Sequence, residues 1–182
     1  MKNNFIFFAV IIFSAFSGFG HKKNYTYTGS ETTLSFSADP SLKFLSREEV
    51  CAVYAPVKGK DSSETELSPF RLSFSVIKNT DAGDEQLLNV EPDGALQFAI
   101  KIMEKAKKTG ESKLTVNGTE RTYYKVSGME PTVEGKPNKL RVCMVMVLHN
   151  KNDNIFVVAD CSKAYAATGE KYFIEVLKTL KF

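Results

Sequence analysis

The chain has 182 residues, of which 43% are hydrophobic and 25% are charged, and it contains no tryptophan. These proportions are those of an ordinary globular protein, and they exclude a disordered, collagen-like or polytopic membrane chain. The formal net charge is only +3, from 24 basic and 21 acidic residues, which is too balanced to suggest a nucleic-acid-binding surface, so we expect no nucleic-acid partner. The length suits one domain with a single core.

The first 20 residues have the pattern of a secretory signal peptide. Lys2 is the single charge, residues 5–16 are apolar, and small residues follow at positions that suit cleavage after Ser17 or Gly20. A helix that spans a bilayer needs roughly 20 apolar residues, and this run is shorter. We therefore expect an exported protein, in the periplasm or outside the cell, with no stable membrane anchor after cleavage.

After this segment we expect a flexible lead over residues 21–31 and a single α+β domain over 32–182. Alternating or continuous apolar residues predict strands at 32–38, 50–55, 70–77, 114–116, 119–126, 140–148 and 155–161. Asn117-Gly118 is the typical pair of a two-residue type I′ hairpin turn. The last two predicted strands are apolar on both faces, so they should lie centrally in the sheet and be covered on each side.

Two helices complete the predicted domain. The first spans 95–108, with Asp93 as its N-cap and Gly110 at its end, and the second spans 170–180, with Thr168 as its N-cap. The first helix carries basic residues that are either its solvated side or a contact for acidic lipids or an acidic partner: Lys101, Lys105, Lys107 and Lys108. Strands, a helix, antiparallel strands and a closing helix predict an antiparallel β-sheet flanked by helices.

The ending 171–182 (Lys-Tyr-Phe-Ile-Glu-Val-Leu-Lys-Thr-Leu-Lys-Phe) resembles the closing helix and short strand of the PsbP-like superfamily. The turn 116–119 ahead of Tyr123 and the order of elements from Thr32 onward are also similar in kind. The superfamily includes photosystem extrinsic proteins, a Ran-binding nuclear factor and bacterial DcrB-like envelope proteins. The resemblance implies an α/β/α sandwich and a non-catalytic, partner-binding role. The chain lacks the Gly-Trp pair that many bacterial members carry after the first strand, and the superfamily shares no catalytic residues to transfer.

Catalytic and metal-binding patterns are sparse in the sequence. His149 stands alone at a strand end, without a second ligand at a metal spacing. His21 lies at one expected mature N-terminus, where an α-amino group and an imidazole together can chelate copper. No nucleophile elbow, phosphate-binding glycine loop or dinucleotide fingerprint is present. We therefore expect no metal, no cofactor and no enzyme activity; the alternative is a small secreted hydrolase with paired carboxylates, a chemistry that needs no histidine.

Two polar loops, 57–68 and 127–139, are the predicted contact surfaces for an unidentified protein partner. Tyr123 and Tyr124 lie on opposite faces of one strand, so one of them is either exposed to a partner or packed under a loop. The first hypothesis is therefore an exported binding protein: an immunity-type protein that shields the cell from a toxin, or an assembly or maintenance factor for an envelope complex.

The N-glycosylation sequon, which has meaning only in a eukaryote, occurs at Asn24-Tyr25-Thr26 and Asn117-Gly118-Thr119.

Three cysteines in an exported chain suggest one disulfide and one free thiol. If the second hairpin folds about Asn152, Cys143 lies directly opposite Cys161, with the two Cα atoms about 4.5 Å apart and within disulfide range. We expect either this bridge, with Cys51 free and buried, or three reduced thiols in the core. A shift of one residue in register would place the two side chains on opposite faces of the sheet and forbid the bond.

Overall fold

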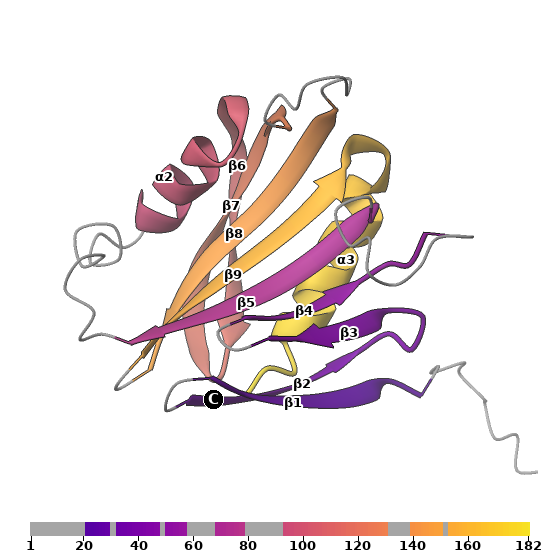
Figure 1. The fold of residues 1–182 in the computed structure, drawn as a ribbon. Helices are drawn as coiled ribbons and strands as arrows, with labels where there is room; N and C mark the ends of the chain where they lie inside the picture. Colours follow the sequence, from indigo (N-terminus) through magenta and orange to yellow (C-terminus); the bar gives the residue numbers. More distant parts are fainter. Residues whose placement is uncertain are drawn as a thin grey trace, which may run out of the picture.

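The computed structural model describes residues 21–29, 32–47, 50–57, 68–78, 93–130, 139–150 and 153–182, and the predicted signal peptide lies outside these ranges. The elements in chain order are β1 (Lys23–Gly29), β2 (Thr32–Ala38), β3 (Lys43–Ser46), β4 (Val50–Tyr54), β5 (Phe70–Lys78), α2 (Asp93–Lys101), β6 (Glu104–Val116), β7 (Thr119–Met129), β8 (Leu140–His149), β9 (Asp153–Ser162), the 3₁₀ turn η2 (Lys163–Tyr165) and α3 (Ala166–Leu177) (Figure 1). None of the helices in these ranges has the length and apolar character that a membrane crossing requires.

Seven strands form one antiparallel sheet in the order β3-β4-β5-β9-β8-β7-β6, and β1 pairs with β2 in a separate two-stranded sheet. β8 and β9 lie inside the large sheet with side chains buried on both faces, as their apolar sequences predict. Asn117 and Gly118 have φ values of 48° and 79°, which confirms the type I′ turn between β6 and β7.

The two helices cover opposite faces of the large sheet. Neighbouring residues of a strand point to opposite faces; Tyr123 belongs to the core that contains α3, and Tyr124 belongs to the core that contains α2. The β1–β2 sheet packs on the α3 face of the large sheet (Figure 1). The ring centroids of Phe36 and Phe74 lie 5.0 Å apart there. The predicted antiparallel sheet flanked by helices is confirmed.

α3 is held on the sheet by its apolar side, as the helical spacing predicts. The buried residues of this side are Phe173, Val176, Leu177 and, just beyond the helix, Leu180. The helix begins earlier than predicted, at Ala166, and its N-cap is Tyr165 rather than Thr168. After the helix, Lys181 pairs with Ser35 of β2 in an antiparallel bridge, so the chain ends in the helix and short extended segment that the resemblance implied.

The first helix is shorter than its sequence pattern indicates. α2 ends at Lys101 and β6 begins at Glu104, so most of the segment predicted to continue the helix is strand. Without β6 the outer edge of β7 would be left unpaired, and this tertiary pairing overrides the local helical spacing. Gly110, expected to end the helix, lies at a register shift in β6. Of the predicted basic helix side, only Lys101 remains on α2.

Two strands were not predicted. β1 occupies most of the expected flexible lead, and it pairs with β2 along its whole length, which buries Tyr25 and Tyr27. β3 pairs with β4 at the other edge of the large sheet. Both are short and rich in polar residues, so each becomes a half-buried strand only when its neighbour supplies the partner.

Candidate functional site

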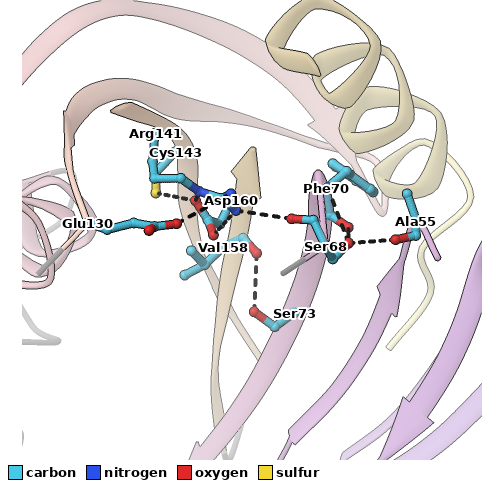
Figure 2. Close-up of polar contacts among 9 residues, drawn as sticks. All are labelled: Ala55, Ser68, Phe70, Ser73, Glu130, Arg141, Cys143, Val158 and Asp160. Atoms are coloured by element: carbon cyan, nitrogen blue, oxygen red, sulfur yellow. Dashed lines mark hydrogen bonds and ion pairs between the residues drawn. The ribbon is translucent and has the colours of Figure 1, made fainter. Parts of the chain in front are cut away.

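The two predicted contact loops start and finish at one end of the large sheet. Ser68 ends the first loop, and Glu130 and Lys139 lie at the base of the second, where the Glu130 backbone N–H donates to the Lys139 carbonyl oxygen at 2.9 Å. Residues 58–67 and 131–138, the central parts of these loops, lie outside the described residues. Five residues at this end form what we call the loop-base cluster: Ser68, Glu130, Arg141, Cys143 and Asp160 (Figure 2).

Arg141, at the start of β8, is the centre of the loop-base cluster. Its Nε and Nη2 atoms donate to the two carboxylate oxygens of Asp160, at 3.0 and 2.5 Å. Its Nη1 lies 3.6 Å from Oε1 of Glu130, and Nη2 also donates to the Ser68 carbonyl oxygen at 3.4 Å (Figure 2). One guanidinium therefore ties the described bases of both loops to β9.

The position of the cluster follows from strand alternation and register. Arg141 and Cys143 share the α2 face of β8, and Asp160 lies directly opposite Cys143 in β9. Arg141 therefore reaches Asp160 along the diagonal of the hairpin. The Cys143 thiol completes the group, with its Sγ 3.7 Å from Oδ1 of Asp160.

The electrostatics of the cluster keep its arginine charged. Arg141 is 7% exposed, whereas the side chains of Asp160 and Glu130 are 38% and 34% exposed. Burial alone would lower the pKa of Arg141, but the hydrogen bonds and charge of Asp160, helped by Glu130, raise it above its ordinary value. The result is a buried, bidentate cation whose two carboxylate partners reach the solvent.

Ser68 anchors the end of the first loop. It is 2% exposed, and its hydroxyl lies 2.7 Å from the Ala55 carbonyl oxygen and 2.5 Å from that of Phe70. The next residue, Pro69, accepts a backbone hydrogen bond from Ser162 at 2.9 Å. The stretch before β5 is thus bound to β4 on one side and to the end of β9 on the other.

Arg141 and Asp160 were not predicted as a pair, although the sequence contains a signal for them. Each is the one charged residue within an otherwise apolar predicted strand, 140–148 or 155–161. A charge in such a strand is buried at a high cost unless an opposite charge meets it. Arg141 lies near the start of the first predicted strand and Asp160 near the end of the second, so a hairpin would bring the two charges together.

Tyr123 and Tyr124 do lie on opposite faces, but neither is an exposed partner contact. They are 3% and 4% exposed. The Tyr123 hydroxyl donates to Oε1 of Glu170 on α3 at 2.8 Å, and the Lys108 ammonium lies 4.9 Å from the ring centroid of Tyr124. The expectation of an exposed tyrosine at this position is therefore corrected: both rings belong to the cores under the helices.

The predicted register of the second hairpin is wrong by one residue. Cys143 lies opposite Asp160, and Cys161 lies opposite Val142, because the last pair before the turn is His149↔Asn154. The side chains of Cys143 and Cys161 consequently point to opposite faces of the sheet. All three cysteines are free and buried, so the proposed Cys143–Cys161 bridge is wrong.

The two histidines lie apart from each other in the described part of the chain, His21 at the start of one segment and His149 near the end of another. His149 is half-buried, with its Nδ1 2.5 Å from Oδ1 of Asn154, and His21 is exposed. Within the described ranges, no three His, Cys, Asp or Glu side chains gather to hold a metal ion. Glu130 and Asp160 both pair with Arg141, which favours a structural role for these two carboxylates over a hydrolytic one.

No protein-family model matches the chain, and no curated protein matches it. Similar solved structures include LpqN, involved in cell envelope biogenesis of Mycobacterium tuberculosis, which is 11% identical with a TM-score of 0.52 over 88% of this chain and 91% of that one. The Ran-binding protein Mog1p of Saccharomyces cerevisiae is 9% identical, with a TM-score of 0.51 over 88% and 95%. Cyanobacterial PsbP (CyanoP) from Synechocystis sp. PCC 6803 is 13% identical, with a TM-score of 0.45 over 90% and 95%. The likeness to LpqN and Mog1p shows that this chain has the PsbP/Mog1-like fold that its sequence resembles.

Proposed function

We propose that this protein is exported, acts in the cell envelope or outside the cell, and binds a protein partner without catalysing a reaction. The observation that carries the proposal is the loop-base cluster, in which one buried arginine ties the bases of two polar loops to a central strand. Loops on a rigid sheet are a common way for a fold to present a variable binding surface. The signal-peptide pattern at the start of the sequence supports export.

The similar structures add support for a binding role. Mog1p is described as Ran-binding, and LpqN is described as involved in cell envelope biogenesis. Because one fold hosts many functions, the site and not the fold has to identify the partner. Two versions of the proposal remain: an immunity-type protein that blocks a toxin, and an assembly or maintenance factor for an envelope complex.

Site-specific photo-crosslinking in living cells tests the proposal. A photoreactive amino acid replaces Leu140, which is 36% exposed beside Arg141, or, as the matched control, Thr119, which is exposed at the other end of β7. We expect a discrete adduct from position 140 and none from position 119. A toxin in the adduct identifies an immunity protein, and a component of an envelope complex identifies an assembly factor. Equal adducts from both positions, or none from position 140, would contradict the proposal.

A further inference from the structure

Among the described residues, β6 is an edge strand of the large sheet and is hydrogen-bonded only to β7. In a hairpin with a two-residue turn, the residues that flank the turn, here Val116 and Thr119, form a hydrogen-bonded pair, and such pairs recur at every second residue. The hydrogen bond from the Glu130 N–H to the Lys139 carbonyl oxygen agrees with this alternation. It indicates that the even-numbered residues of β7 form backbone hydrogen bonds with β8, so that the odd-numbered residues form theirs with β6. From Gly110 to Val116, where the pairing with β7 is regular, every second residue of β6 therefore directs its backbone groups away from the sheet.

The outward-directed residues of the regular part of β6 are Glu111, Lys113 and Thr115. All three side chains are exposed; those of Glu111 and Lys113 are 58% and 67% exposed. The register shifts of β6 end at Gly110, so the ladder from there to Val116 is regular. This stretch presents backbone N–H and C=O groups that no other strand of the described residues pairs with, together with one acidic and one basic side chain on the same face. Within the chain, Glu111 pairs with Lys108 at 2.5 Å and Lys113 pairs with Glu120 at 2.7 Å.

We propose that two copies of this chain pair antiparallel along β6, about a two-fold axis at Ser112. In this register Glu111 lies opposite the partner's Lys113, and Lys113 lies opposite the partner's Glu111. Both positions direct their backbone groups outward, so each pair exchanges two backbone hydrogen bonds. The interface is thus self-complementary in hydrogen bonding and in charge, as a two-fold interface requires.

Neighbouring registers lack this complementarity. An axis at Glu111 places two acidic side chains opposite each other, and an axis at Lys113 does the same with two basic ones. An axis at Leu114 places Lys113 opposite the partner's Thr115 and leaves no charge pair. Like charges directly opposite each other destabilise a strand pair, so the charges select the axis at Ser112.

Lysines and bulges on an edge strand normally discourage pairing with other chains. In β6 the bulges lie before the regular stretch, so they do not block pairing along it. Lys113 repels a basic strand, and of the registers compared above only the proposed one places it opposite the partner's Glu111. The edge of β6 can therefore pair with a strand that carries the same acidic and basic residues, and it disfavours other strands. Because the paired segment is short and its ion pairs are exposed, the dimer is weak and weakens further in salt.

Sedimentation velocity of the purified protein, up to about 1 mM, covers the range of weak specific association and tests this proposal. We expect dimerisation that increases with protein concentration. Glu111→Lys and Lys113→Glu each put two like-charged pairs into the interface, and each should weaken dimerisation about tenfold or more. Mixed in equal amounts, the two variants again place opposite charges at both pairs, so the mixture should associate where each variant alone does not.

Glu175→Lys is the matched control. It makes the same charge change as Glu111→Lys and breaks the Lys171–Glu175 ion pair, but it lies on α3, which packs on β9, β2 and β5 rather than on β6. It should leave dimerisation unchanged. A wild-type protein that stays monomeric, a mixture that does not associate, or an equal loss from Glu175→Lys would overturn the proposal. The crosslinking outcome at Leu140 is independent of all these results, so either proposal can fail alone.

Discussion

At the scale of single residues, the three cysteines behave as small apolar side chains. Burial raises the pKa of Cys51 and Cys161 from the ordinary 9.0 to about 12. Burial, reinforced by the charge of Asp160, also raises the pKa of Cys143. The thiolate is the reactive form of cysteine, so these groups are protected both by inaccessibility and by protonation.

We therefore predict that the native protein resists alkylation at about pH 8, whereas urea-unfolded protein takes up one label at each cysteine. Since the folded thiols keep their protons to a higher pH than the unfolded ones, the stability they contribute is present in full below about pH 9 and decreases toward pH 12. Intact-mass measurement after timed alkylation, with and without urea, reads the result. Fast labelling of Cys143 in the native state would contradict the buried position of this thiol.

At the scale of elements, the docking of α3 depends on a close approach to β9 and β5. A Cβ atom added at Gly169 would lie 2.4 Å from the Cys161 sulfur and 3.0 Å from Cδ2 of Phe70. Glycine is thus needed in the first turn of α3, although alanine is the better helix former by about 1 kcal/mol.

We predict that Gly169→Ala lowers the free energy of unfolding by about 1–3 kcal/mol, because overpacking outweighs the gain in helix propensity. Cys161→Ala added to this variant removes the nearest atom and should recover part of the loss. Gly110→Ala is the control, since a Cβ there meets only the Lys125 side chain at an ordinary 3.8 Å. Urea unfolding followed by circular dichroism measures all three. Equal losses at positions 169 and 110 would exclude the close approach as the cause.

Strands in which apolar residues alternate because one face is buried could be predicted from the sequence. β2 and β5 match their alternating patterns to within one residue, because each has one face in the α3 core. The start of β6 could not be predicted, because its helical spacing is overridden by pairing with β7. β1 was missed for a related reason: its alternation becomes informative only once β2 lies beside it.

The sequence predicted the two loops of the candidate site but not which charged side chains meet at their bases. Polar composition located the two loops, and the lone charges of Arg141 and Asp160 in apolar strands mark a buried pair. Which residues meet across the hairpin depends on the length of one turn, and a change of one residue moves Cys161 away from Cys143 and brings Asp160 opposite it. Local sequence does not specify that length, so the predicted disulfide was wrong.

At the scale of the whole molecule, the two faces of the sheet carry unequal cores. α3 places the fully buried Phe173 and Leu177 into a core that also includes β1 and β2. α2 contributes the small side chains of Ala95 and Ala99, and its Phe98 is 37% exposed. The smaller apolar contact on the α2 face implies a lower free energy of local opening there.

We predict that the backbone amides of α2 exchange with solvent through local opening, whereas those of α3 exchange only when the whole domain unfolds. Hydrogen exchange read by mass spectrometry on peptides from each helix measures the difference. Phe173→Ala leaves a cavity in the larger core and should cost about 3–5 kcal/mol. It should speed exchange in α3, which follows global unfolding, and should leave the local opening of α2 almost unchanged, because the α3 core stays formed while α2 opens. Met103→Ala, in the smaller core, destabilises the native state relative to both the locally open and the fully unfolded states, so it should speed exchange in both helices. Equal protection of the two helices in the wild-type protein would show instead that the sheet and both its covering layers unfold as one cooperative unit.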